Sequence, residues 1–349
     1  METRFVKIED IHQDEQHINE AGQIIKDGGL VAFPTETVYG LGGDALNKDS
    51  SMKIYSAKGR PSDNPLIVHI CDWKDLEHIV SYIPDSAKAL ADRFWPGPLT
   101  MIFQKSEVVP SETTGGLNTV AVRFPKDDIA LAFIRAAGGY VAAPSANTSG
   151  RPSPTSGQYV YEDMNGKIEM ILDGGTCQIG LESTIVDLTE DTPVILRPGY
   201  VTEEMLQEVL DEVDVDQTIL SVSSGIAPKA PGMKYRHYAP KGSLTIVDGD
   251  ADLVVAFVND KIKKGDASGK KMGVIATDET IRLYQECNKK SVGSRSDEAS
   301  IARRLYEILR QFDDEGVEEI YAESFDSTGM GQAIMNRLLK AAGHTVIHV

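Results

Sequence analysis

The sequence predicts an α/β protein built of two domains. Its 349 residues exceed the length of about 100 to 200 residues that one domain usually has. Short apolar runs alternate with segments of helical periodicity on both sides of residues 221–240, a stretch rich in Ser, Gly and Pro. We therefore expect a larger domain over 1–207, a linker over 208–240 and a smaller domain over 241–349.

In the first domain, each predicted strand is a short apolar run that ends at Pro, Gly or a polar cluster. These runs are Leu30–Phe33, Pro65–Ile70, Leu99–Phe103, Val120–Phe124, Tyr140–Ala143, Met170–Leu172, Thr184–Leu188 and Val194–Leu196. Apolar residues at three- and four-residue steps predict helices between several of them. These helices are Asn19–Lys26, Ser51–Ala57, Asp85–Arg93 and Ile129–Ala137. Because the last strands follow one another closely, we expect a mixed sheet.

Residues 201–220 carry seven acidic and no basic side chains, with apolar residues between them. This pattern predicts an acidic amphipathic helix with a short continuation. After the linker, strands and helices alternate again. We expect strands at Leu244–Val247, Met272–Ala276, Glu319–Glu323 and Thr345–Val349, and helices at Asp252–Lys264, Glu298–Phe312 and Gly331–Ala342. Such alternation predicts a small, parallel, doubly wound Rossmann-like domain.

Composition and charge narrow the classes of function. An apolar share of 41% without a long apolar run, and a start that lacks the apolar stretch of a secretory signal, predict a cytoplasmic protein that does not enter a membrane. The formal charge of −18 repels a phosphate backbone, so we expect no stable binding of tRNA by this chain alone. The three cysteines have no metal-ligand spacing and are expected to be buried, so we predict no protein-caged metal site.

Two separated segments have the chemistry of a phosphate-binding surface. Lys58 and Arg60, in the sequence Lys-Gly-Arg-Pro, combine a compact ammonium with a planar fork of donors, which suits a polyphosphate. The corner Ser145-Ala146-Asn147 follows an apolar strand and offers hydroxyl and amide groups among turn-forming residues. No Walker loop, dinucleotide fingerprint, zinc-protease motif or nucleophile elbow is found, so the familiar ATPase, dehydrogenase and hydrolase classes are disfavoured.

Other polar residues stand at strand ends, where α/β sheets bind ligands. Arg123 lies among apolar residues within a predicted strand and must face a carboxylate, of the protein or of a ligand; we favour a ligand. Thr35 either contacts a ligand or caps a turn, and His69 is either a satisfied core histidine or a substrate contact. Ser183 and Arg197 lie at the ends of two later strands and can reach the same cleft.

The combination of motifs resembles the threonylcarbamoyl-AMP synthase family in its long form, which has a YrdC-type catalytic domain and a carboxy-terminal domain. The resemblance covers nearly the whole chain. It is carried by Pro34–Leu41, Lys58–Pro61, Pro65–Leu66, Trp95–Thr100, Arg123–Pro125, Pro144–Gly150, Ser183–Thr184 and, in the tail, Gly331–Arg337. The resemblance implies a nucleotidyltransferase that makes threonylcarbamoyl-AMP and pyrophosphate from L-threonine, bicarbonate and ATP for a modified adenosine in tRNA.

The resemblance also implies a division of the site residues between the two substrates. Threonine would be bound by Thr35, His69, Arg123, Ala143 and Ser183. ATP would be bound by Lys58, Arg60, Ser62, Thr119, Ser145, Asn147, Ser153, Arg197 and Tyr235, with Lys58 and Arg60 as the catalytic cations. Mg²⁺ is expected to enter with ATP, held by phosphates and water. The product would pass to a separate tRNA threonylcarbamoyl transferase.

Three points stay open from the sequence. Residues 231–240, rich in aromatic and cationic groups, form either a lid over the site or a solvated spacer. A carbamoyl transferase of the hydrogenase-maturation type is an alternative activity, although we find no acylphosphatase-like or zinc-finger segment. An RNA-binding or ribosome-maturation factor is an alternative from another class, which the charge of −18 disfavours.

Overall fold

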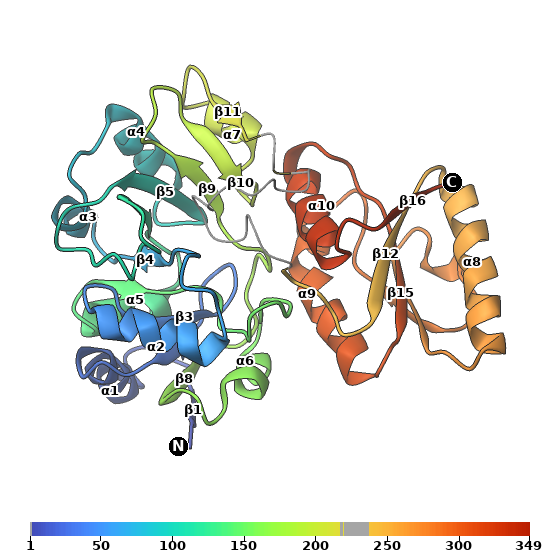
Figure 1. The fold of residues 1–349 in the computed structure, drawn as a ribbon, viewed down its shortest axis with the longest axis horizontal. Helices are drawn as coiled ribbons and strands as arrows, with labels where there is room; N and C mark the ends of the chain where they lie inside the picture. Colours follow the sequence, from blue (N-terminus) through green and yellow to red (C-terminus); the bar gives the residue numbers. More distant parts are fainter. Residues whose placement is uncertain (1, 217–218, 220–236) are drawn as a thin grey trace. The chain divides into compact units, whose positions relative to one another are not determined.

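The computed structural model describes residues 2–216, 219 and 237–349. The chain divides into two compact units (Figure 1). The first comprises residues 1–149 and 153–234, and the second comprises residues 150–152 and 235–349. Each unit has its own sheet, so each is described by itself.

The first unit is built on a sheet of 11 strands, and this sheet is mixed, as the sequence predicts. Across the sheet the strands lie in the order β1 (Arg4–Lys7), β8 (Met170–Asp173), β2 (Val31–Phe33), β3 (Gly40–Asp44), β7 (Val141–Ala142), β4 (Ile67–His69), β6 (Thr119–Arg123), β5 (Leu99–Gln104), β9 (Thr184–Asp187), β10 (Val194–Arg197) and β11 (Asp214–Val215). Strand β6 is parallel to β4 and antiparallel to β5, so strands of both directions meet at the centre of the sheet.

Apolar residues of the central strands alternate between two buried clusters because successive side chains point to opposite faces of a sheet. In β2, Val31 and Phe33 belong to one cluster and Ala32 to the other. Strand β8 repeats the pattern, with Met170 in the first cluster and Ile171 in the second. Both faces of the sheet are therefore covered, and polar side chains at strand ends stand out from an apolar background.

Helices α1 (Glu15–Lys26) and α5 (Asp128–Ala136) supply buried residues to the first of these clusters. The other helices of the unit are α2 (Lys48–Lys58), α3 (Trp73–Ile79), α4 (Asp85–Phe94), α6 (Gly157–Met164) and α7 (Glu203–Gln207). Asn47 caps the start of α2 by accepting a hydrogen bond from the Asp49 N–H. Gly59 ends it in the left-handed conformation (φ 62°), which glycine adopts without steric cost. Arg60 therefore leaves the helix in a new direction.

The structure adds elements that the sequence pattern did not predict. Strand β3 is built largely of glycines, and β1, α3 and α6 were not expected. The acidic amphipathic helix with a short continuation, predicted within 201–220, is α7, which has only five residues; the short strand β11 follows it in the same segment. Consecutive acidic side chains repel one another, so the charged stretch does not sustain a long helix.

The second unit contains a five-stranded sheet whose strands are all parallel, which confirms the predicted doubly wound domain. Its strands lie in the order β14 (Asn288–Ser291), β13 (Met272–Ala276), β15 (Glu319–Glu323), β12 (Ser243–Asp248) and β16 (Val346–His348). Its helices are α8 (Ala251–Ala267), the short 3₁₀ helix η2 (Ile281–Leu283), α9 (Glu298–Asp314) and α10 (Gly329–Ala341). Figure 1 shows α8 on one face of the sheet and α9 and α10 on the other. None of the helices in the described ranges has the length and apolarity needed to cross a bilayer.

Gly22 of α1 provides a test of how closely α1 and α5 pack. A Cβ atom at this position would lie 2.5 Å from the carbonyl carbon of Ala136. Alanine is the better helix former by about 1 kcal/mol, but here that gain is opposed by a clash with backbone. We expect Gly22→Ala to lower the free energy of unfolding by about 1–3 kcal/mol, measured by chemical denaturation.

The matched control is Asn19→Ala on the exposed side of the same helix. It should leave stability unchanged or raise it slightly, since alanine is favoured at an open helix position. An increase in stability for Gly22→Ala as large as that of the control would contradict the close packing.

Candidate active site

The Lys58 ammonium joins the two segments that the sequence identifies as a phosphate-binding surface. Lys58 is only 2% exposed, and its Nζ donates hydrogen bonds to the backbone carbonyls of Ser145 and Asn147, the latter at 2.5 Å. In return, the Lys58 carbonyl accepts a hydrogen bond from the Ser149 N–H at 2.9 Å. The end of α2 and the Ser-Ala-Asn corner, far apart in sequence, thus form one structural unit.

The Ser-Ala-Asn corner is also held by its own contacts. It follows β7, and the Ala146 N–H donates to the Tyr39 carbonyl at 2.8 Å, just before the glycine-rich β3. The Ser145 hydroxyl donates to the Asn147 Oδ1 at 2.5 Å. A compact turn with two polar side chains in mutual contact follows directly from a buried strand.

Arg60 lies two residues beyond the end of α2 and is half-buried. Its Nε donates to the Asn64 carbonyl at 3.2 Å, and its Nη2 donates to the Pro65 carbonyl at 3.0 Å. The guanidinium therefore closes the turn that leads into β4. Ser62 is exposed within this turn. The structure brings the two predicted catalytic cations, Lys58 and Arg60, to the same end of α2.

Three polar residues occupy neighbouring positions across the centre of the sheet. Arg123 on β6 is paired with His69 on β4 and with Thr100 on β5. Residues directly opposite each other on neighbouring strands project to the same face. An arginine, a histidine and a threonine are thus presented side by side from the ends of three buried strands.

Arg123 has a protein partner that the sequence did not identify. Its Nη2 lies 2.7 Å from Oε2 of Glu36, and the two side chains are 4% and 6% exposed. Glu36 belongs to the polar corner between β2 and β3, next to Thr35. The expectation that a buried arginine faces a carboxylate is met by the protein, and contact with a ligand stays a prediction. The sequence did contain a signal for this pair, because Glu36 is a carboxylate next to Thr35, a residue already predicted to belong to the site.

His69 is neutral in the folded protein over the usual working range of pH. Burial, together with the nearby Arg123 guanidinium, lowers the pKa of its imidazole to about 3. Its Nδ1 lies 3.1 Å from the Ile67 carbonyl, and its ring makes an edge contact with Phe33. The imidazole thus has contacts of its own within the core and also stands next to Arg123.

Thr35 uses its hydroxyl to shape the corner in which it lies. The hydroxyl donates to the Val38 carbonyl at 2.7 Å, accepts from the Thr37 N–H at 3.2 Å and contacts the Thr37 hydroxyl at 2.9 Å. This is the turn-capping role that the sequence left open. Ala143, the other small residue predicted at this subsite, follows β7 and donates its N–H to the Ile67 carbonyl at 2.8 Å.

Ser183 connects residues that were predicted to serve different substrates. Arg197 Nη2 donates to the Ser183 hydroxyl at 3.1 Å, and this hydroxyl lies 2.7 Å from the hydroxyl of Thr100. Thr100 is in turn the cross-strand neighbour of Arg123. A continuous path of contacts therefore leads from Arg197, predicted to bind ATP, to Arg123, predicted to bind threonine.

Three further residues that were predicted to bind ATP are Ser153, Thr119 and Tyr235. The Ser153 hydroxyl donates to Glu182 Oε1 at 2.6 Å, and both side chains are buried. Thr119 lies at the opposite end of β6 from Arg123, where it is paired with Gln104. Tyr235, together with the predicted lid residues up to 236, lies outside the described residues.

Neither metal-ligand clusters nor reactive cysteines stand out. In the described part of the chain, no group of three or more His, Cys, Asp or Glu side chains is arranged to hold a metal ion. Cys71 and Cys177 are buried as predicted, whereas Cys287 is only partly buried. Burial raises the pKa of Cys71 and of Cys287 to about 11, so these thiols stay protonated.

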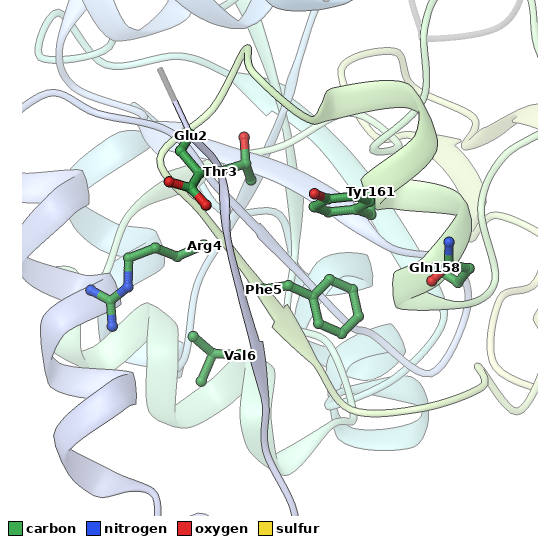
Figure 2. A pocket seen from close by; sticks show the side chains of 7 residues that line it. All are labelled: Glu2, Thr3, Arg4, Phe5, Val6, Gln158 and Tyr161. Carbon is green, nitrogen blue, oxygen red and sulfur yellow. The ribbon is translucent and has the colours of Figure 1, made fainter.

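Two cavities lie in the first unit, and one of them borders the Lys58 end of this site. One, of about 490 Å³, lies along β1, where Phe5 stands near Tyr161 (Figure 2). Its cation, Arg4, is paired with Glu20. The other, of about 650 Å³, is lined by Lys58 and Thr148, and also by Lys53, Lys167 and Glu169 among others. Neither cavity is lined by Arg123, His69 or Ser183.

Comparisons with known proteins cover both units. A family model described as "Telomere recombination" matches residues 23–199, and one described as "Threonylcarbamoyl-AMP synthase, C-terminal domain" matches residues 201–343. The chain is 48% identical to a threonylcarbamoyl-AMP synthase of Pyrococcus abyssi, over 96% of this chain and 97% of the relative. It is 45% identical to one of Bacillus subtilis, over 98% of both.

A solved structure gives the same result. The crystal structure of Pyrococcus abyssi Sua5 complexed with L-threonine is 46% identical in sequence and covers 100% of both chains, with a TM-score of 0.92. Sequence and structure therefore agree along the whole length, and the chain belongs to the threonylcarbamoyl-AMP synthase family.

Proposed function

We propose that this threonylcarbamoyl-AMP synthase uses the site around Lys58 and Arg123 to join threonine, bicarbonate and ATP. The observation that carries the proposal is the path of contacts from Arg197 through Ser183 and Thr100 to Arg123. This path supports the adjacency of Arg197, which we assign to ATP, and Arg123, which we assign to threonine. An adenylation reaction needs such adjacency, because the acceptor must reach the α-phosphorus of the nucleotide.

Threonine is bound on the Arg123 side. The guanidinium binds the threonine carboxylate, since arginine is suited to bidentate contact with a carboxylate. Thr35, His69, Ala143 and Ser183 surround the remainder of the amino acid. His69 is neutral, so it adds no charge to that of Arg123. A Pyrococcus abyssi relative with L-threonine bound supports this choice of ligand.

ATP is bound on the Lys58 side. The residues that we assign to ATP are Lys58, Arg60, Ser62, Thr119, Ser145, Asn147, Ser153, Arg197 and Tyr235, of which Tyr235 lies outside the described residues. ATP enters as its magnesium complex, with the metal carried by phosphate oxygens and water, as is usual for this ion. The fixed cations neutralise charge on the departing pyrophosphate.

The reaction needs no side-chain nucleophile. The neutral amine of threonine forms a bond to the carbon of bicarbonate-derived carbon dioxide; the amine proton and the hydroxide from bicarbonate leave as water, and a carbamate results. An oxygen of that carbamate attacks the α-phosphorus, the bond to the β-phosphate oxygen breaks, and pyrophosphate leaves. What the protein contributes is the placement of two anions beside each other and the neutralisation of their charge.

The assay that tests this function is pyrophosphate release from ATP by the purified full-length chain. Release should require both threonine and bicarbonate. Mass spectrometry of the reaction mixture should detect threonylcarbamoyl-AMP as the second product. Release that proceeds equally without threonine would contradict the proposal. Transfer of the product to tRNA by a separate transferase, the cytoplasmic location, and a lid role for residues 231–240 stay predictions.

Replacing the two cations at the end of α2 should separate their contributions. We expect Lys58→Ala and Arg60→Ala each to slow pyrophosphate release by at least about 100-fold, the usual scale for a lost transition-state donor. Lys58→Ala should also lower the free energy of unfolding by about 1–3 kcal/mol, because two carbonyls lose their donor.

Lys53→Ala is the matched control, because Lys53 is an exposed lysine on the same helix whose Nζ donates to the Gly28 carbonyl. It should retain wild-type rates. Steady-state kinetics and chemical denaturation of the three variants supply the comparison. Wild-type rates in Lys58→Ala or Arg60→Ala would rule out the assigned role of that residue.

The neutral state of His69 predicts a dependence of stability on pH. Its pKa in the folded protein, about 3, lies below the ordinary value of 6.5, so between these values the unfolded chain binds a proton that the folded chain does not. This component of stability is intact above the ordinary pKa and is lost as the pH falls. At pH 4 it should cost up to about 3 kcal/mol.

Chemical denaturation of wild type and His69→Gln between pH 7 and pH 4 measures this component. Carboxyl groups titrate in both proteins, so the difference between the two isolates His69. Wild type should lose more stability than the variant over this range. Parallel curves would show that the imidazole is protonated in the folded state.

A further inference from the structure

The backbone of Glu36 is held in place by an adjacent loop. The Ile179 N–H donates to the Glu36 carbonyl at 2.8 Å, and the Gly180 N–H donates to the Thr37 carbonyl at 3.1 Å. The Thr35 hydroxyl closes the same turn from the other side. These hydrogen bonds therefore fix the backbone position of Glu36.

Its carboxylate, in contrast, is incompletely bonded. Among the described residues, neither oxygen of Glu36 has a hydrogen-bond partner, although both are shielded from solvent. The same holds for Nε and Nη2 of Arg123. The 2.7 Å approach between the two side chains is an ion pair without hydrogen-bond geometry. Buried polar groups are rarely left in this state, and such groups commonly mark the place of a ligand.

The charges around this pair favour a ligand that carries both signs. Burial raises the pKa of the Asp127 carboxyl, and the neighbouring Glu36 raises it further, so these two carboxyl groups lie in one region. Asp127 is engaged as the cap of α5, where it accepts a hydrogen bond from the Ala130 N–H at 2.9 Å. Glu36 thus offers the unbonded acceptor, and Arg123 offers the unbonded donors.

We propose that Glu36 is a substrate-contacting residue that accepts a hydrogen bond from the α-amine of the amino acid whose carboxylate is bound by Arg123. The inference rests on the proposed function, which places threonine at Arg123. An α-amino acid is a zwitterion, so one ligand supplies the missing partner to both side chains. Glu36 then directs the amine that must take up carbon dioxide, and it discriminates against acids that lack this amine.

Another role for Glu36 makes the opposite prediction. If its carboxylate only occupied Arg123 until the substrate carboxylate replaced it, removal of its charge would free the guanidinium. Threonine would then bind more tightly to Glu36→Gln than to wild type. If Glu36 holds the amine, the same substitution weakens threonine binding, because a charge-assisted hydrogen bond is lost.

The experiment measures binding by calorimetry to the full-length chain without ATP. The probes are L-threonine and β-hydroxybutyrate, which retains the carboxylate and hydroxyl of threonine but has no amine. We expect Glu36→Gln to raise the Kd for threonine by about 10-fold or more and to leave that for β-hydroxybutyrate within about threefold of wild type. Tighter threonine binding, or an equal loss for both probes, would overturn the proposal.

Asp127→Asn is the matched control. It removes a neighbouring carboxylate, while asparagine caps a helix as well as aspartate does. It should change the ratio of the Kd for threonine to the Kd for β-hydroxybutyrate by less than about threefold, which is small beside the effect of about 10-fold expected for Glu36→Gln. An equal change in Asp127→Asn and Glu36→Gln would assign the effect to the general charge of the region and overturn the role of Glu36.

Two measurements keep the result interpretable. Wild type alone should bind threonine more tightly than β-hydroxybutyrate, and equal affinities would overturn the proposal even if Glu36→Gln did not fold. Threonine-dependent pyrophosphate release by wild type separately tests the proposed function. Intact release together with unchanged threonine binding in Glu36→Gln would reject this inference and leave the function standing.

Discussion

The hydrogen bonds of the Lys58 ammonium are the interaction on which the site depends. An ammonium that is only 2% exposed is costly to remove from water unless its donors are satisfied. The carbonyls of Ser145 and Asn147 provide that compensation. Because one group bonds to both carbonyls, the end of α2 and the corner after β7 are placed together, and neither is stable in this arrangement without the other.

The same argument applies to Arg123, but with a different outcome. Its ion pair with Glu36 offsets part of the cost of burying two charges, yet hydrogen-bonding groups on both sides are left over. Hydrogen bonds of Lys58 hold the backbone of the Ser-Ala-Asn corner, whereas Arg123 has donors left for another partner. His69 shows how the protein keeps the balance of charge, since the imidazole next to Arg123 is kept neutral.

Much of this architecture is predictable from sequence, and the exceptions have physical reasons. Strands such as β2 and β13 stand out because they are short apolar runs bounded by turn or polar residues. Strand β3 does not, because Gly40, Gly42 and Gly43 disfavour a strand by local preference. A Cβ at Gly40 would lie 3.1 Å from the Phe33 ring. Tertiary packing therefore requires glycine at this strand position, although glycine has a low intrinsic preference for strands. Glu36 was missed because its pairing with Arg123 joins segments far apart in the chain, which spacing alone does not show.

The contrast between the net charge of −18 and the cations at the site explains which anions this chain can handle. Exposed charges are screened beyond about 8 Å in physiological salt, whereas buried charges are screened much less. Lys58, Arg123 and Arg197 are all buried, so a small anion that reaches them meets cations rather than the acidic surface. We expect a long polyanion, which must contact the surface itself, to be repelled. This expectation agrees with the prediction that a small activated intermediate passes to a separate protein that binds the nucleic acid.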